Sequence, residues 1–166
     1  ILNKDDKNVI EQGMNSKAKK IYFSLFEELD EGVYLKNNQI ITSFAKSKNN
    51  FFPVGELNPV MQCQVENLLS AIAVTSITGV TPRHIKDITG NFKGLEHRIE
   101  WVRTFRGIDF VNDSKGTNVG SVNKSLMSFS RPIILIVGGK DKGANFLTLK
   151  KVFKEKVKHL VLIGET

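Results

Sequence analysis

Apolar residues in the second half of the chain form short runs that predict first a hairpin and then alternating helices and strands. The runs Ile99–Phe105 and Ile108–Val111 are rich in β-branched and aromatic residues, and Arg106-Gly107 separates them, which predicts a β-hairpin. Beyond the hairpin we expect, in order, a helix from Val119 to about Phe129, a strand Ile133–Val137, a helix from Phe146 to about Glu155 and a strand His159–Ile163. Apolar strands that alternate with helices predict a Rossmann-like parallel sheet with helices on its faces.

The first half of the chain carries a mixed pattern of strands and helices. Asp5 or Asp6 follows a short apolar stretch and can cap a helix that ends near Met14. The elements expected after it are a strand Ile21–Phe26, a hairpin of Val33–Leu35 and Gln39–Ile41, an edge strand Phe51–Val54, a helix Gln62–Thr78 and a helix that Thr81 caps and that runs to about Thr89. The fold class predicted for the chain is therefore α/β.

The two patterns meet near Gly90–Gly94. We therefore expect one domain in residues 1–92 and a second in residues 93–166. The chain starts with the strand-like residues Ile1-Leu2 rather than a methionine, and it stops directly after a strand-like run. We expect it to be an internal piece of a longer protein, with an incomplete second domain.

Candidate chemistry gathers at the outer end of the predicted hairpin. Because antiparallel strands place their outer ends together, His97 and Arg98 at the entry should lie close to Asp113 and Lys115 at the exit. Asp113 can accept hydrogen bonds from ribose hydroxyls, and Lys115 offers a charge to phosphate or carboxylate. Gly116 allows a close approach of the backbone. This grouping predicts a site for an anionic, hydroxyl-rich ligand such as a nucleotide.

Composition narrows the class of protein without identifying it. Of the 166 residues, 40% are hydrophobic and 25% are charged, as in ordinary globular proteins. The single cysteine, Cys63, excludes an internal disulfide and fits a reducing compartment. No apolar run reaches the roughly 18 residues that cross a bilayer. The net charge of +7 comes from lysines scattered along the chain, which favours a solvated surface over a nucleic-acid platform.

Two well-known phosphate-binding patterns are absent from the sequence. Neither GxxxxGK[ST] nor GxGxxG occurs, so the chain has no phosphate cradle of its own. A glycine pair does follow the expected strand Ile133–Val137, in Gly138-Gly139-Lys140-Asp141-Lys142-Gly143. The three histidines, at positions 84, 97 and 159, show no metal-ligand spacing.

Three of these segments together resemble the Mur ligase family. They are His97-Arg98, the loop NDSKGTN at 112–118 and GGKDKG at 138–143. A weaker match is the stretch ending in Asn67, where Cys63-Gln64 replaces the His-Asn of the family motif. The resemblance implies that residues 1–92 are the C-terminal part of a central ATP-binding domain. Residues 93–166 would then be the first part of a Rossmann-like, amino-acid-binding C-terminal domain.

The resemblance also implies a reaction. The sequence is similar to the branch of the family that adds D-glutamate to UDP-N-acetylmuramoyl-L-alanine in peptidoglycan synthesis. That branch uses ATP and Mg²⁺ and forms an acyl-phosphate intermediate. The family's P-loop and Mg²⁺ ligands precede the stretch matched here, so we expect no metal ligand in this chain and no activity from it alone. The expected protein is a cytoplasmic monomer that binds small molecules, not nucleic acid or membrane.

Residue roles follow from the same resemblance. It assigns Asn67 to adenine, His97 and Arg98 to the nucleotide, Asp113 to ribose, Lys115 and His97 to catalysis, and Thr117 and Lys142 to a carboxylate of D-glutamate. Structural roles remain open beside these: a polar residue in a first helical turn for Asn67, a helix cap for Thr117 and a solvated turn residue for Lys142.

Two other functions also remain open. One is a Mur-type or folylpolyglutamate-type ligase that uses a different amino acid. The other is a non-catalytic basic module that binds nucleotides or nucleic acid. Binding that falls steeply with salt would indicate the module, and a nucleotide-sized ligand bound independently of salt would indicate a ligase.

Overall fold

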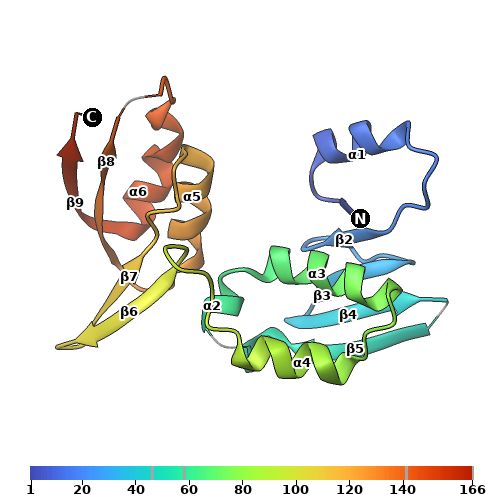
Figure 1. Ribbon diagram of the computed structural model, residues 1–166. Coiled ribbons are helices and arrows are strands. Elements are labelled where there is room, and N and C mark those ends of the chain that lie inside the picture. Colours follow the sequence, from blue (N-terminus) through green and yellow to red (C-terminus); the bar gives the residue numbers. More distant parts are fainter. Residues whose placement is uncertain (46, 58, 141, 166) are drawn as a thin grey trace. The chain divides into compact units, whose positions relative to one another are not determined.

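The structure is a computed structural model that describes the chain except residues 46, 58, 141 and 166, and except the side chains of residues 50, 59 and 60. The described chain divides into two compact units, Ile1–Lys93 and Gly94–Thr166 (Figure 1). Both units combine helices with β-sheet, which confirms the α/β class.

The first unit is built on a five-stranded sheet. Its strands are β1 Leu2–Asn3, β2 Tyr22–Ser24, β3 Gly32–Lys36, β4 Gln39–Phe44 and β5 Ser47–Pro53, in that spatial order. The pairs β1–β2 and β2–β3 are parallel, and β3–β4 and β4–β5 are antiparallel. The predicted hairpin is β3–β4, and its turn uses Asn37 and Asn38 at φ of 49° and 61°, a region that asparagine tolerates. Strand β5 lies at the sheet edge, as Pro53 predicts.

Helices complete the first unit. They are α1 Lys7–Met14, the short 3₁₀ turn η1 Val54–Glu56, α2 Pro59–Gln62, α3 Val65–Ile77 and α4 Pro82–Asn91. Asp6 caps α1 and Thr81 caps α4, as the sequence predicts. The predicted start of the long helix, at Gln62, is wrong. Gln64 has a non-helical backbone, with φ −127° and ψ 29°, and α3 therefore begins only at Val65.

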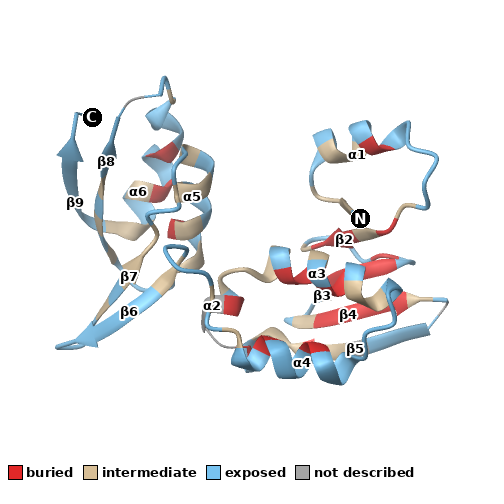
Figure 2. Ribbon diagram, in the orientation of Figure 1, coloured by how far each residue is buried: buried red, intermediate tan, exposed pale blue. Residues whose placement is uncertain are grey.

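The core of the first unit lies between the sheet and α3. Val33 and Ile40 on the central strands, and Leu69, Ile72 and Ala73 on α3, are fully buried. Figure 2 shows this buried layer along β3, β4 and the facing side of α3. The contact fixes the start of α3, where Asn67 lies.

The second unit contains two small sheets. Strands β6 Glu100–Phe105 and β7 Ile108–Asn112 form the predicted antiparallel hairpin. Its turn, Arg106-Gly107, has φ of 49° and 75°, as tight hairpin turns require. Strands β8 Ile133–Gly139 and β9 Val157–Gly164 pair in parallel. The remaining elements are α5 Val119–Ser128, the 3₁₀ turn η2 Phe146–Leu149 and α6 Lys150–Lys156.

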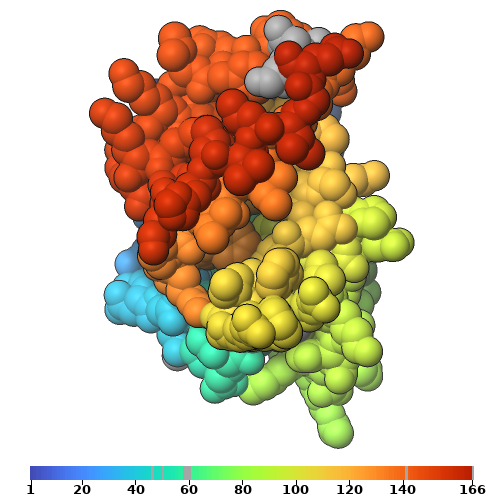
Figure 3. All heavy atoms as spheres, turned by 90° about the vertical axis from the view of Figure 1, so that its left-hand side faces the viewer, coloured from blue at the N-terminus to red at the C-terminus, as the bar shows by residue number. Residues whose placement is uncertain are grey.

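One face of the β8–β9 sheet is covered by helices. Leu126 of α5 and Leu149 and Val152 beside it are buried, and Ile133 and Leu135 of β8 pack against them. The other face carries exposed side chains such as Ile134 and Ile136. Figure 3 looks onto strand β9, which runs across the surface. Parallel strands joined by a helix confirm the Rossmann-like character of this unit.

The direction in which α5 and α6 run shows where the segment before α5 and the loop after β8 lie in the second unit. Lys156 Nζ, at the end of α6, donates a 2.8 Å hydrogen bond to the backbone oxygen of Phe129, directly after α5. Both helices therefore end where β8 and β9 begin, and they start at the opposite edge (Figure 1). The residues before α5 and the loop after β8 share this carboxyl edge, where open α/β sheets bind their ligands.

Candidate functional site

The turn that leads into the hairpin has an unusual backbone. His97 and Ile99 have φ of 66° and 48°, a left-handed conformation that is rare for a β-branched residue such as isoleucine. The backbone N–H of Arg98 donates to Leu95 O at 3.1 Å and closes the turn. Such a conformation costs of order 1–3 kcal/mol and persists only where its surroundings hold it.

Two carboxylates and one backbone contact hold this turn. The N–H of His97 donates to Glu100 Oε2 at 2.8 Å, and the N–H of Ile99 donates to Asp113 Oδ1 at 3.1 Å. The N–H of Lys115 donates to His97 O at 2.9 Å. The prediction that the His97-Arg98 turn and the loop after β7 lie together is therefore confirmed.

The carboxylate of Asp113 is bonded on both oxygens. Oδ1 holds the turn through Ile99, and Oδ2 accepts a 2.6 Å hydrogen bond from Ser125 Oγ on α5. A Cβ at Gly116 would lie 2.9 Å from Oδ2 of Asp113, closer than real Cβ contacts allow. A side chain at 116 would therefore force the Asp113 carboxylate to shift, so glycine suits the fold of the loop as well as any approach of a ligand.

Thr117 and Asn118, just before α5, have different structural roles. Asn118 Oδ1 accepts from the N–H of Ser121 at 2.8 Å and is the helix cap. Thr117 is exposed, and its N–H donates to Lys115 O at 2.9 Å. The structural role that the sequence left open for Thr117 belongs to Asn118, so the Thr117 hydroxyl is not needed as a cap.

The side chains of Arg98, Lys115 and Lys142 are exposed. Lys115 precedes the N-terminus of α5, where the helix dipole is positive. Lys142 follows β8 at the same edge of the unit, and its neighbour Asp141 lies outside the described residues. Exposed cations of this kind suit an anionic ligand.

The imidazole of His97 is held from one side. Asn112 Nδ2 lies 2.9 Å from His97 Nδ1. The carboxylate oxygens of Glu96 and Glu100 lie 3.6 Å from Nε2 and Nδ1, respectively, beyond hydrogen-bond distance. The sequence placed Asn112 in a motif but predicted no role for it. It gave no signal for Glu100 or Ser125.

Asn67 belongs to the first unit. It is exposed in the first turn of α3, and its Nδ2 lies 3.5 Å from Gln64 Oε1. The adjacent Glu66 accepts a 2.8 Å hydrogen bond from Asn3 Nδ2 at the end of β1. Asn3 therefore ties the sheet to the turn of α3 that displays Asn67.

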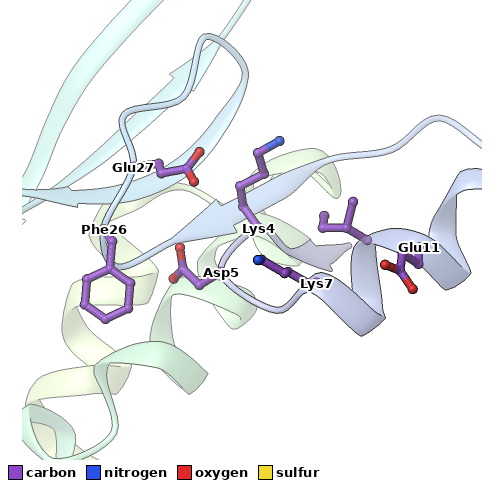
Figure 4. Close-up of a pocket in the computed structure, with 7 residues that line it drawn as sticks. Lys4, Asp5, Lys7, Glu11, Phe26 and Glu27 are labelled. Carbon is purple, nitrogen blue, oxygen red and sulfur yellow. The ribbon is translucent and has the colours of Figure 1, made fainter.

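The first unit also has a shallow hollow beside β1 and α1. Lys4, Asp5, Lys7, Ile10, Glu11, Phe26 and Glu27 line it (Figure 4). The Asp5 carboxylate binds Ser24 Oγ at 2.5 Å and the N–H of Leu25 at 2.7 Å, so its role is structural. Across the part of the chain that the structure describes, no cluster of three His, Cys, Asp or Glu side chains could hold a metal ion. No described helix is both long and apolar enough to span a membrane.

Comparison with known proteins adds the family. Residues 97–166 match the Mur ligase glutamate ligase domain. The whole chain is 43% identical to "UDP-N-acetylmuramoylalanine--D-glutamate ligase" of Clostridioides difficile (strain 630) and 42% identical to the protein of that name from Alkaliphilus metalliredigens (strain QYMF). A third relative, from Geotalea daltonii, is 40% identical over 99% of the chain and has the same name.

The chain spans 36–37% of the length of these relatives. The match to the domain covers the hairpin, the loop after β7 and the β8–β9 sheet, which are the elements that form the candidate site. The domain match at residues 97–166, the similarity over the whole chain and the three motifs all point to the Mur ligase family.

Proposed function

We propose that this chain holds the nucleotide and the acceptor amino acid in an ATP-dependent ligase, and that the complete enzyme adds D-glutamate to UDP-N-acetylmuramoyl-L-alanine. The observation that carries the proposal is the bonded rim in which the backbone of His97 meets Asp113 and Lys115, in the segment that leads into α5. The names of its relatives support the reaction. Under this proposal, residues 1–92 are part of the central domain of the complete enzyme, and residues 93–166 are part of its C-terminal domain.

The nucleotide side of the proposed site uses Asp113 and the turn. Each carboxylate oxygen of Asp113 accepts one internal hydrogen bond, and each oxygen has a second acceptor position. Those positions can receive two ribose hydroxyls without breaking the internal contacts. Arg98 is exposed beside them and supplies charge for phosphate. Asn67 would contact adenine from the first unit.

The amino-acid side uses the carboxyl edge of the second unit. Lys115 precedes Asn118, the cap of α5, by three residues, and an anion bound at this positive helix end would suit the lysine as well. Thr117, which is exposed and is not the helix cap, offers a hydroxyl. Lys142 offers an ammonium group from the loop after β8. Together these groups suit the two carboxylates of glutamate.

ATP would supply the phosphoryl group that activates the carboxylate of the nucleotide-sugar substrate. The residues described here position that chemistry: Lys115 can neutralise charge that develops as the phosphate leaves, and Thr117 and Lys142 can orient the attacking amino acid. The Mg²⁺ ligands of the proposed enzyme would lie outside this chain, as the family resemblance implies. The proposed enzyme is cytoplasmic, where its small-molecule substrates would be found, and the family resemblance suggests a monomer.

The test uses the full-length protein that contains this chain. It is incubated with UDP-N-acetylmuramoyl-L-alanine, ATP, Mg²⁺ and one amino acid at a time: D-glutamate, L-glutamate, L-lysine or glycine. ADP and the new amide product are measured together. We expect both products only with D-glutamate. Product with a different amino acid would indicate a sister ligase, and no product with any would contradict the proposal.

A further inference from the structure

The side-chain amide of Asn112 has a fixed orientation. Its Oδ1 accepts a 3.1 Å hydrogen bond from the backbone N–H of Ser114, which can only donate. Its Nδ2 lies 3.3 Å from Glu100 Oε2, which can only accept as a carboxylate. Both contacts would be lost if the amide were turned over, so the nitrogen of Asn112 faces His97.

This orientation assigns the proton of the imidazole. Asn112 Nδ2 lies 2.9 Å from His97 Nδ1, and because the amide nitrogen donates, Nδ1 must accept. A neutral imidazole that accepts at Nδ1 carries its hydrogen on Nε2. The orientation of the Asn112 amide thus selects one of the two tautomers.

The selected N–H is available to a ligand. The His97 side chain is 51% exposed, and the nearest carboxylate oxygen to Nε2, on Glu96, is 3.6 Å away, too far for a hydrogen bond. Hydrogen bonds from His97 N to Glu100 and from Lys115 N to His97 O hold the backbone of His97, and Asn112 contacts the ring itself. The other charged group near the ring is Glu100 beside Nδ1, and the next charged residues along the chain and across the backbone contact are the exposed Arg98 and Lys115.

We propose that Asn112 is a positioning residue that locks His97 in its Nε2–H tautomer, so that His97 presents a neutral hydrogen-bond donor to an oxygen of the bound nucleotide. His97 then acts by donating, and its Nδ1 is not available to take a proton from a substrate. The ligand part of this inference rests on the proposed function, whereas the tautomer part rests on hydrogen bonds within this chain alone.

The tautomer can be measured without any enzyme activity. In the 166-residue chain labelled with ¹⁵N-histidine, long-range proton–nitrogen spectra distinguish the two tautomers, and replacing His84 or His159 with Gln assigns the three rings. We expect His97 to show the Nε2–H pattern. Asn112→Asp retains the acceptor for Ser114 but removes the donor, so it should convert His97 to a form protonated at Nδ1. Asn123→Asp, exposed on α5, controls for the added charge.

The outcomes separate the two parts of the inference. An Nδ1–H pattern in the unaltered chain, or an unchanged pattern in a folded Asn112→Asp variant, would overturn the role of Asn112. In the complete enzyme, Asn112→Asp should raise the KM for ATP about tenfold relative to Asn123→Asp, equivalent to one lost hydrogen bond. A converted tautomer with an unchanged KM for ATP would instead contradict the placement of His97 at the nucleotide.

Discussion

Ser125 Oγ on α5 donates a 2.6 Å hydrogen bond to Asp113 Oδ2, and Asp113 Oδ1 accepts from the N–H of Ile99. One carboxylate therefore ties the helix to the strained turn that displays His97. The two partners of Asp113 are 12 and 14 residues away in the sequence. Removing either contact should lower the stability of the second unit and alter the geometry of the candidate site.

The Ser125 contact can be tested through stability. Ser125→Ala should lower the free energy of unfolding by about 1.5 kcal/mol, since the hydroxyl donates to a charged, partly buried acceptor. The control is Ser121→Ala on the same helix, where the backbone N–H, not the hydroxyl, makes the cap contact. Urea denaturation of both variants gives the comparison. Equal stabilities would mean that the Asp113–Ser125 contact contributes nothing.

Asp113 should matter for ATP more than for glutamate. In the complete enzyme, Asp113→Ala should raise the KM for ATP by roughly ten- to a hundredfold, corresponding to about 1.5–3 kcal/mol, and should largely spare the KM for D-glutamate. Because Asp113 also holds the fold, Asp113→Asn, which keeps an acceptor oxygen, serves as the folded reference. An unaltered KM for ATP in both folded variants would reduce Asp113 to a structural residue.

Thr117 and Asn118 should respond in opposite ways to alanine. Asn118→Ala removes the cap of α5 and should cost about 1 kcal/mol of stability. Thr117 is exposed, so Thr117→Ala should change stability by less than about 0.5 kcal/mol while weakening the use of D-glutamate about tenfold. Thermal unfolding and the KM for D-glutamate, measured on both variants, decide this. A Thr117 variant with normal glutamate kinetics would remove Thr117 from the site.

The 166-residue chain should be inactive by itself. It has no GxxxxGK[ST] loop with which to cradle the transferring phosphate, and phosphoryl transfer depends on that positioning. Phosphate release by this chain, with the complete set of substrates, should equal the rate without protein. Turnover above that background would show that the chain holds a phosphate site that its sequence does not reveal.

Local sequence signals predicted the elements whose backbone hydrogen bonds stay within the element or a neighbouring strand. The hairpin at 100–112 and the capped helix α4 are examples. Strand β2 is shorter than the predicted Ile21–Phe26, because the N–H groups of Leu25 and Phe26 donate to Asp5 and Ser24 side chains instead of the sheet. Side-chain competition of this kind has no periodic signal, and the contact with Asp5 depends on a residue 20 positions away in the sequence.

The candidate site was predictable only in outline. Antiparallel pairing was enough to bring His97 beside the loop of Asp113 and Lys115. It could not reveal Ser125 as a partner of Asp113, because that contact depends on the rotation of α5 against the loop. The tautomer of His97 likewise depends on which way one amide faces, a feature of three-dimensional contacts and not of residue type.

The central claim is that the carboxyl edge after β8 binds the acceptor amino acid while the loop after β7 binds the nucleotide. Lys142 tests it, since Lys142 follows β8 and is exposed. Losing one charge-assisted contact to a glutamate carboxylate costs roughly 1.5–3 kcal/mol. Lys140, exposed in the same loop, provides the matched control for the loss of one positive charge.

The decisive measurement is the KM for D-glutamate and the KM for ATP, side by side, in the Lys142→Ala and Lys140→Ala forms of the complete enzyme. Lys142→Ala should raise the KM for D-glutamate by roughly ten- to a hundredfold and leave that for ATP nearly unchanged, and Lys140→Ala should alter neither. Equal shifts of both constants in Lys142→Ala, or no shift in either, would contradict the assignment of this edge to the amino acid.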